Sequence, residues 1–253
     1  MKYFCVSDVH GFFNFLKQSL NEAGFDASNP EHCLISLGDI FDRGYEPIQC
    51  LRFVNSLPNK ILIRGNHETL VEEALKRGEF LYHDWCNGTV ATVSDLAYFG
   101  LDSELRHVDK IFKSASNNID YNKYINSLVN YFETDNYIFV HGWIPCKYDK
   151  DTKTYSFTPD WRNGDWNVAT WINGMEAWSN GIKINNKTII CGHWHTSWGH
   201  HFLHNDGMEW ENPRSTNPEH RRARFDPFID DGIIAIDACT AHSHKVNCVV
   251  IED

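Results

Sequence analysis

Three short polar strings, each of which follows a short apolar run, constrain this sequence most. Within the first 68 residues they are, in order, Ser7-Asp8-Val9-His10-Gly11, Gly38-Asp39-Ile40-Phe41-Asp42-Arg43-Gly44 and Gly65-Asn66-His67-Glu68. The apolar runs predict strands, so the polar side chains would lie at strand ends. An open α/β sheet places its binding and catalytic groups at that edge.

The first third of the chain predicts alternating strands and helices. We expect strands over residues 3–6, 33–37 and 61–63, with one helix near residues 12–23 and a second that opens at Pro47. Phe12, Leu16 and Leu20 recur at four-residue spacing, as on one face of a helix. This alternation predicts a parallel sheet with right-handed crossovers.

The remainder predicts a helical middle and a second sheet. Residues 69–133 are expected to be mostly helical, and strands at 137–140 and 187–191 each lead into a histidine string. The final strands, at 232–237 and 246–251, are expected to pair antiparallel because their connection is short. Residues 196–231 are expected to be a loop insertion over the active site, within a single domain of residues 1–253.

Composition excludes several classes of partner. The formal net charge is -11, from 23 Lys and Arg against 34 Asp and Glu, which argues against general binding of nucleic acid or anionic lipid. The 8 cysteines are scattered without a Cys-x-x-Cys pair, and no apolar run approaches the ~18 residues of a spanning helix. We therefore expect a cytoplasmic protein that binds no membrane, and the sequence leaves its oligomeric state open.

The polar strings combine carboxylate, amide and imidazole donors. The two oxygens of Asp39 suit it to bridge two ions, and Asn66 offers a neutral oxygen. Mixed oxygen and nitrogen donors suit manganese, iron or zinc, so we expect two divalent metal ions, with manganese as the first choice. The candidate ligands are Asp8, His10, Asp39, Asn66, His141 and His193.

The motifs Asp-x-His-Gly, Gly-Asp-x-x-Asp-Arg-Gly, Gly-Asn-His-Glu, His-Gly and Gly-His, in this order, resemble the calcineurin-like metallophosphoesterase superfamily. The resemblance is greatest to its Ser/Thr phosphoprotein phosphatase and diadenosine tetraphosphatase branch. It implies an α/β fold, a four-layer αββα sandwich in which helices flank two mixed β-sheets. It also implies a ligand set: Asp8 and His10 on the first metal, Asp39 as the bridge, Asn66, His141 and His193 on the second, and His195 as a further ligand of the first.

The resemblance also implies roles for three residues that are not ligands. His67 would protonate the leaving alkoxide, Asp42 would hold that imidazole, and Arg43 would clamp the phosphate. We expect in-line attack of a metal-bound hydroxide on phosphorus, without a covalent phospho-enzyme. Asn66 and Arg162 are further candidates for substrate binding, although the surroundings of Arg162 do not match the second phosphate-binding arginine of the protein phosphatases.

The substrate class is the least constrained feature. The main expectation is a Ser/Thr protein phosphatase-like enzyme that hydrolyses phosphomonoesters, with a phosphoprotein or nucleotide-type phosphoester as its partner. Diadenosine tetraphosphatase or cyclic nucleotide phosphodiesterase activity is the alternative, because Gly142-Trp143-Ile144-Pro145 follows His141. A stretch of tryptophans could line a base-binding wall or belong to the core: Trp161, Trp166, Trp171 and Trp178. A non-catalytic metal-binding module would lack ligands or the acid, and none is missing.

Overall fold

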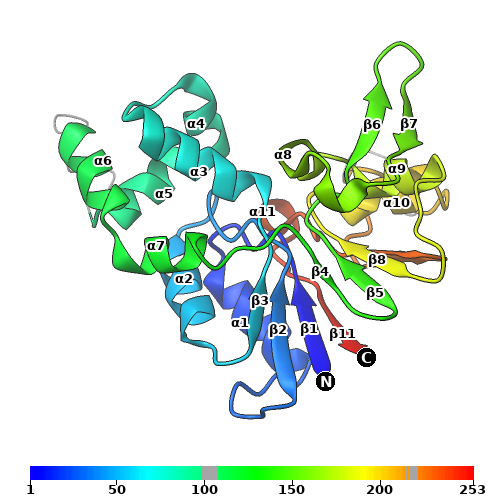
Figure 1. The fold of residues 1–253 in the computed structure, drawn as a ribbon, viewed down its shortest axis with the longest axis horizontal. Helices are drawn as coiled ribbons and strands as arrows, with labels where there is room; N and C mark the ends of the chain where they lie inside the picture. The colour runs from blue at the N-terminus through cyan, green and yellow to red at the C-terminus, as the bar shows by residue number, and fades with distance from the viewer. Residues whose placement is uncertain (99–107, 213, 215, 217–221) are drawn as a thin grey trace.

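Two mixed β-sheets lie between helices in the computed structural model (Figure 1). The structure describes residues 1–98, 108–212, 214, 216 and 222–253. The first sheet has the strand order β11-β1-β2-β3 and the second has β4-β5-β8-β10-β9. The strands of the two sheets are β1 (Lys2–Val6), β2 (His32–Ser36), β3 (Lys60–Leu62) and β11 (Cys248–Glu252), then β4 (Phe132–Glu133), β5 (Tyr137–Phe139), β8 (Thr188–Cys191), β9 (Phe228–Asp230) and β10 (Ile233–Ala235).

Alternation along the strands explains the layers. In β1, Phe4 and Val6 pack among side chains of the helices, whereas Cys5 packs in a separate cluster with Phe139 and Ile190 of the second sheet. Successive strand residues point to opposite faces, so each sheet buries both of its faces. A third apolar cluster covers the outer face of the second sheet. These three apolar clusters separate four layers and confirm the expected αββα sandwich.

The first sheet follows the predicted alternation of strand and helix. β1, β2 and β3 pair in parallel, connected by α1 (Phe13–Glu22) and α2 (Pro47–Ser56). Leu16 and Leu20 of α1 are buried against the sheet, as their spacing predicted. The carboxyl ends of three parallel strands therefore meet at one edge, where the three polar strings begin.

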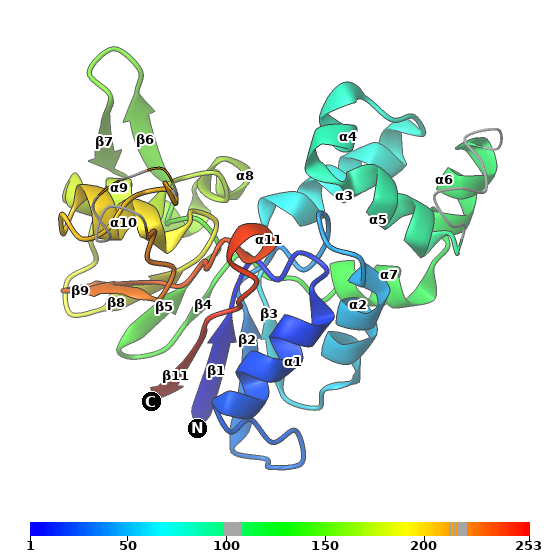
Figure 2. The same ribbon diagram turned by 180° about the vertical axis from the view of Figure 1, so that it is seen from behind.

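The expected antiparallel pair of strands at 232–237 and 246–251 is wrong. β10 pairs in parallel with β8, whereas β11 crosses to the first sheet and pairs antiparallel with β1. Figure 2 shows β11 beside β1 and places α11 (Thr240–Ser243), which joins β10 to β11, near the junction of the two sheets. Short apolar strands carry little information about their partners, and the short connection spans two sheets instead of forming a hairpin.

The middle of the chain is helical, as expected, in the part that the structure describes. Residues 99–107 of the predicted helical range 69–133 lie outside the described residues. No helix in the described part is long and apolar enough to cross a bilayer. The helices of this region are α3 (Asn66–Arg77), α4 (Tyr82–Asn87), α5 (Thr89–Leu96), α6 (Val108–Ser116) and α7 (Ile119–Ile125).

The second half contains elements that the sequence did not indicate. A two-stranded hairpin projects from it in Figure 1, and the expected loop at 196–231 includes a helix and strand β9. Residues 213, 215 and 217–221 of that expected loop lie outside the described residues. The additional elements are β6 (Cys146–Asp149), β7 (Thr154–Phe157), a 3-10 turn (Trp161–Asn163), α8 (Trp166–Ala169), α9 (Gly174–Ser179) and α10 (Thr196–Phe202).

Candidate active site

The strand ends hold the predicted site residues on a strained backbone. Twelve non-glycine residues of the described chain have positive φ, and six of them belong to the predicted site. A left-handed backbone costs a non-glycine residue about 1–2 kcal/mol, and such residues gather at functional sites. The six, with φ between 50° and 69°, are Asp8, His10, Asp39, Asp42, Arg43 and His193.

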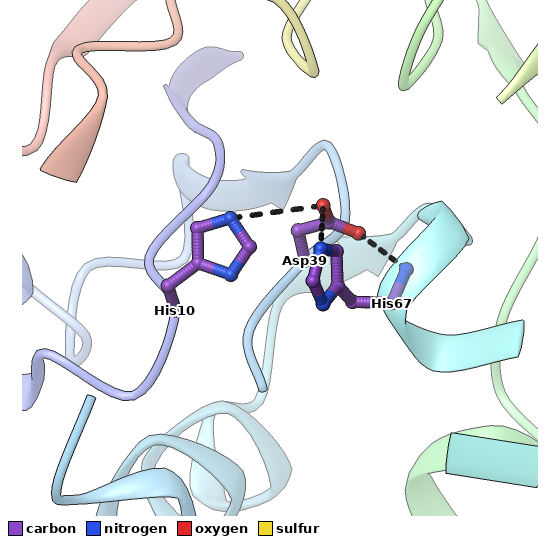
Figure 3. Close-up of side chains that lie close together, drawn as sticks. All are labelled: His10, Asp39 and His67. Carbon is purple, nitrogen blue, oxygen red and sulfur yellow. Dashed lines mark hydrogen bonds and ion pairs between the residues drawn. The ribbon is translucent and has the colours of Figure 1, made fainter. Parts of the chain in front are cut away.

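Asp39 lies between two groups of converging donors. One group joins it to His141 and His193, and the other joins it to His10 and His67, which Figure 3 shows. Oδ2 of Asp39 lies 3.5 Å from Nε2 of His141 and 3.8 Å from Nε2 of His10. Donors that are each about 2.1 Å from one ion lie roughly 3–4 Å from one another. Both spacings therefore suit a carboxylate shared by two cations.

Backbone carbonyls determine which ring nitrogens face the site. Nδ1 of His10 donates to the carbonyl of Phe41, and Nδ1 of His141 donates to that of Leu37, each at 2.8 Å. A neutral imidazole that donates from Nδ1 keeps a lone pair on Nε2. Metal-binding histidines usually have this second hydrogen bond, which orients the ring.

An acceptor faces an acceptor in the group around His141. Nε2 of His141 lies 2.8 Å from Oδ1 of Asn66, and both atoms carry lone pairs when the ring donates from Nδ1. Buried lone pairs that converge in this way require a positive partner. The side chains present therefore fit a divalent cation, on the chemistry of the donors themselves.

Burial favours the neutral forms of His10 and His193 and disfavours the charged form of Asp39. Burial and the nearby Arg43 guanidinium hold the pKa of His10 well below its ordinary value, and burial beside His141 does the same to the pKa of His193. Burial raises the pKa of Asp39 well above its usual range, and the carboxylate of Asp8 adds to that rise. Bound cations would reverse the effect on Asp39 and leave the neutral imidazoles free to coordinate.

Asp8 is held in place from the second half of the fold. Its Oδ2 accepts the backbone N–H of His193 at 2.9 Å, and its carbonyl accepts the hydroxyl of Thr240 at 2.7 Å. Oδ1 of Asp8 lies 3.9 Å from Nε2 of His10. The carboxylate therefore borders the His10 group without belonging to either group of mutually close donors.

His67 of the His10 group also forms a cluster with Asp42 and Arg43 beside Asp39. Nδ1 of His67 lies 2.7 Å from Oδ2 of Asp42, and both side chains are buried. Burial lowers the pKa of His67, but the carboxylates of Asp39 and Asp42 outweigh it and the pKa is raised from its ordinary value. The guanidinium of Arg43 reaches Nε2 of His10 at 3.0 Å and Nε2 of His67 at 3.2 Å. The imidazole of His67, which can carry a proton, and the guanidinium of Arg43 thus lie side by side next to Asp39.

Two threonines of α5 hold Asp42, and sequence reasoning missed both. Thr89 donates to Oδ2 of Asp42 at 2.8 Å, and Thr92 donates to Oδ1 at 2.7 Å and accepts the Asp42 N–H at 3.0 Å. Gly88, with φ +87°, allows α5 to begin close to the backbone of Arg43, because a Cβ at Gly88 would lie 2.5 Å from the backbone nitrogen of Arg43. Only the spacing of two threonines after a glycine could have indicated the contact.

Glu68 ties the second and third polar strings together. Its Oε2 accepts the N–H groups of Asp39 at 2.9 Å and Gly65 at 2.8 Å, and its Oε1 accepts the Ile40 N–H at 3.0 Å and the Tyr124 hydroxyl at 3.1 Å. Its side chain is fully buried. Glu68 belongs to the third polar string, but its position in the sequence does not indicate this role.

The structure does not bring His195 into either donor group. Nε2 of His195 lies 3.4 Å from Oε1 of Glu209, and its ring packs on Trp210 with centroids 4.3 Å apart. Burial lowers the pKa of His195, against the opposing effect of Glu209. Its role as a ligand stays a prediction.

Arg162 is engaged away from the donor groups. Its guanidinium makes a two-pronged pair with Glu133, at 2.6 Å and 3.0 Å, and lies over the Trp161 ring at 4.3 Å. Glu133 thus neutralises the charge of the guanidinium, and Trp161 covers its planar face. We therefore leave Arg162 out of the proposed site.

Comparison with known proteins agrees with this geometry. Residues 1–245 match the family model for calcineurin-like phosphoesterases. The chain is 39% identical over 69 residues to a symmetrical bis(5'-nucleosyl)-tetraphosphatase of Proteus mirabilis and 36% identical over 74 residues to serine/threonine-protein phosphatase 2 of Escherichia coli. These matches cover 27% and 29% of this chain, and only 24% and 33% of the relatives' own lengths.

Solved structures share the fold at low sequence identity. A cold-active protein-tyrosine phosphatase of a psychrophilic Shewanella species has a TM-score of 0.52 and 15% identity, over 100% of this chain and 75% of its own. A putative diadenosine tetraphosphatase has a TM-score of 0.50 and 13% identity, over 99% of this chain and 89% of its own. With the match to the family model over nearly the whole sequence, the chain belongs to the calcineurin-like phosphoesterase family.

Proposed function

We propose that the protein is a metal-dependent phosphoesterase that hydrolyses phosphomonoesters, of the Ser/Thr protein phosphatase type. The position of Asp39, between two donor groups and beside the buried pair of Asp42 and His67, carries this proposal. Membership of the family supports the reaction class, and the name of the Escherichia coli relative supports the substrate type.

Each side chain of the proposed site would have a separate role in the reaction. Divalent cations, when bound, would supply a water nucleophile of lowered pKa and positive charge near the phosphoryl oxygens. Arg43 would turn its two nitrogens from the imidazoles to phosphate oxygens. His67 would then give a proton from Nε2 to the leaving oxygen, while Asp42 keeps the ring oriented. Asn66 would hold an ion or a phosphate oxygen.

The metal and the compartment belong to the same proposal. We infer that manganese is the resident metal, with iron or zinc as alternatives, because the donors mix carboxylate and amide oxygen with imidazole nitrogen. His195 would join the first ion only if its side chain left Glu209. The cytoplasm is the compartment that fits the scattered cysteines.

A nucleotide substrate is the second candidate. The string that follows His141 gives this candidate less support than expected. Its Trp143 is buried and donates to the Ile182 carbonyl at 3.2 Å, so it belongs to the core. The name of the Proteus mirabilis relative supports this candidate instead. Trp171, which is half exposed, supports it as well.

Removing and restoring metal tests the proposed function. We expect the protein to lose phosphatase activity after chelation and to regain it with manganese, because the donors around Asp39 form two groups that suit divalent cations. The assay would compare an aryl phosphate, a phosphoserine peptide, diadenosine tetraphosphate and a cyclic nucleotide, by release of phosphate from the first two and of a nucleotide product from the last two. Absence of hydrolysis on all four after reconstitution would refute the proposal.

Thr92→Val should weaken the acid step while leaving metal binding intact. Valine keeps the shape but removes a hydroxyl that bonds to both the backbone and the carboxylate of Asp42. A hydrogen bond to a charged group contributes ~1.5–3 kcal/mol, so we expect kcat on a phosphoserine peptide to fall by about 10- to 100-fold, with KM nearly unchanged. Steady-state kinetics would measure both constants.

Two matched variants control this result. Thr92→Ser retains the hydroxyl and should retain most of kcat. Ser94→Ala lies on the same helix and removes a buried hydroxyl that donates to Val90 instead of Asp42, so it should leave kcat unchanged. Equal losses in Thr92→Val and Ser94→Ala would mean that α5 has only a structural role.

A further inference from the structure

A groove borders the donor groups on the side of α3. It has a volume of about 680 Å³, within the range of sites for small ligands, and its walls come from α3 and from residues 164–171. Figure 1 shows α3 and α8 facing one another across the ends of the strands. Thr69, Glu72, Glu73 and Lys76 of α3 line this wall.

Trp171 is the residue that joins this groove to the donor groups. It lines the groove, and its ring meets the ring of His193 edge-on, with centroids 5.8 Å apart and planes at 82°. Its side chain is 51% exposed, in contrast to Trp161, which is 2% exposed. Trp166 also lines the groove, but it stacks on Tyr131 with centroids 5.0 Å apart. Trp171 therefore offers an aromatic face to a ligand.

The backbone holds Trp171 in position without a bound ligand. Its N–H donates to the Val168 carbonyl at 3.0 Å, and the preceding turn accepts a bond from the N–H of Trp143 through Ala169 at 3.1 Å. Both Trp143 and Ala169 are buried. A half-exposed aromatic side chain on an anchored turn is a platform for stacking that costs little conformational entropy on binding.

The lining of the groove has a small excess of negative charge, which disfavours binding of a phosphate chain. Arg64 is paired with Glu72, so the charged groups that remain in the lining are Lys76, Glu73 and Asp165, an excess of one negative charge. Side-chain amides of Asn130 and Asn167 also line it. The lining thus offers hydrogen-bond acceptors and amides beside one aromatic face, which suits a flat, uncharged heterocycle with amino and ring-nitrogen groups on its edge.

We propose that this groove binds the nucleobase of a phosphoester substrate, stacked on Trp171, while the phosphate lies at Asp39 and Arg43. The proposal rests on the phosphoesterase function and develops its second candidate, a nucleotide substrate. A phosphotyrosyl ring could also stack on Trp171, but a phenol ring has no heteroatom edge to pair with the carboxylates and amides of the lining. A phosphoserine residue has no ring at all.

The test compares two substrates that differ only by the base. Adenosine 5′-monophosphate and ribose 5-phosphate share the sugar and the phosphoester, and the manganese-loaded full chain would be assayed on both. We expect a higher kcat/KM for the nucleotide, and Trp171→Ala should lower that value by about 10-fold while changing the value for ribose 5-phosphate by less than about 2-fold. Trp171→Phe should retain much of the preference.

A binding measurement separates this proposal from the reaction itself. Adenosine, which has no phosphate, should bind the metal-free protein in calorimetry and bind Trp171→Ala at least about 10-fold more weakly. Trp85→Ala is the matched control, because Trp85 is 50% exposed and does not line the groove. It should change neither binding nor kinetics.

The outcomes distinguish the proposal from the proposed function. Three results would overturn the nucleobase site and leave the phosphoesterase function intact. The first is hydrolysis with no preference for the nucleotide, and the second is an equal loss of kcat/KM in Trp171→Ala on adenosine 5′-monophosphate and ribose 5-phosphate. The third is a loss of kcat/KM in Trp171→Ala that is confined to a phosphotyrosine peptide. No hydrolysis of any phosphoester after metal loading would overturn the phosphoesterase, whereas adenosine binding would still report on the groove.

Discussion

Asp39→Asn should abolish loading of the metal pair and lower kcat by about 1,000-fold or more. Oδ2 of Asp39 lies within 4 Å of the Nε2 atoms of His10 and His141, so one charge serves both donor groups. An amide can keep the hydrogen bond that Asp39 accepts from the His67 N–H at 2.9 Å, but it has no charge to hold two cations. Cation stabilisation of the reacting phosphoryl group is worth several kcal/mol, and ~4 kcal/mol corresponds to ~1,000-fold in rate.

Metal content and thermal unfolding distinguish this effect from misfolding. Atomic emission on the desalted protein should show metal in the wild type and little in Asp39→Asn. The metal-free variant should unfold at the same temperature as the metal-free wild type or above it, because the substitution removes a buried charge. Asp151→Asn, on an exposed turn, is the matched control and should keep both metal and rate. Full metal occupancy in Asp39→Asn would contradict the bridging role.

His67→Asn should slow the hydrolysis of alkyl phosphates far more than that of aryl phosphates. The imidazole is held by Asp42 at 2.7 Å, and its pKa is raised by Asp39 and Asp42 despite burial, as an acid at neutral pH requires. General acid catalysis contributes roughly 100- to 10,000-fold. We expect a loss of that order for a phosphoserine peptide and a loss below about 10-fold for p-nitrophenyl phosphate, whose leaving group needs little protonation.

A series of phosphate esters with graded leaving groups measures this difference. The slope of log kcat/KM against the pKa of the leaving group should steepen in His67→Asn. His204→Ala removes another imidazole that pairs with a carboxylate, at 2.8 Å to Asp230, outside the donor groups, and should leave the slope unchanged. Equal losses across the series would assign His67 to binding or structure and exclude proton transfer.

The residues of the proposed site were predictable because they follow strands. Asp8, Asp39 and Asn66 follow the ends of β1, β2 and β3 within four residues, and the geometry of a parallel sheet brings the carboxyl ends of its strands together. The same logic located His141 and His193 on the second sheet. Local sequence therefore predicted which side chains share one space.

The supports of the site were not predictable in the same way. Thr89 and Thr92 reach Asp42 across about 50 positions, and their hydroxyls resemble those of any helix start. The partner of β11 was equally hidden, because a short apolar strand fits the edge of either sheet. Trp171 shows the same limit for burial, since nothing in its neighbours distinguishes it from the buried Trp161.

The pairing of β1 with β11 has a consequence for the order in which the nascent chain matures. Residues 248–252 complete an edge of β1, and the N–H of His193 orients Asp8 at the end of the same strand. At translation rates of about 5–20 residues per second, β11 leaves the ribosome roughly 10–50 seconds after β1. Asp8, the first of the proposed metal ligands to be translated, is therefore among the last to be fixed, and a polypeptide released early would contain all three polar strings without a finished site.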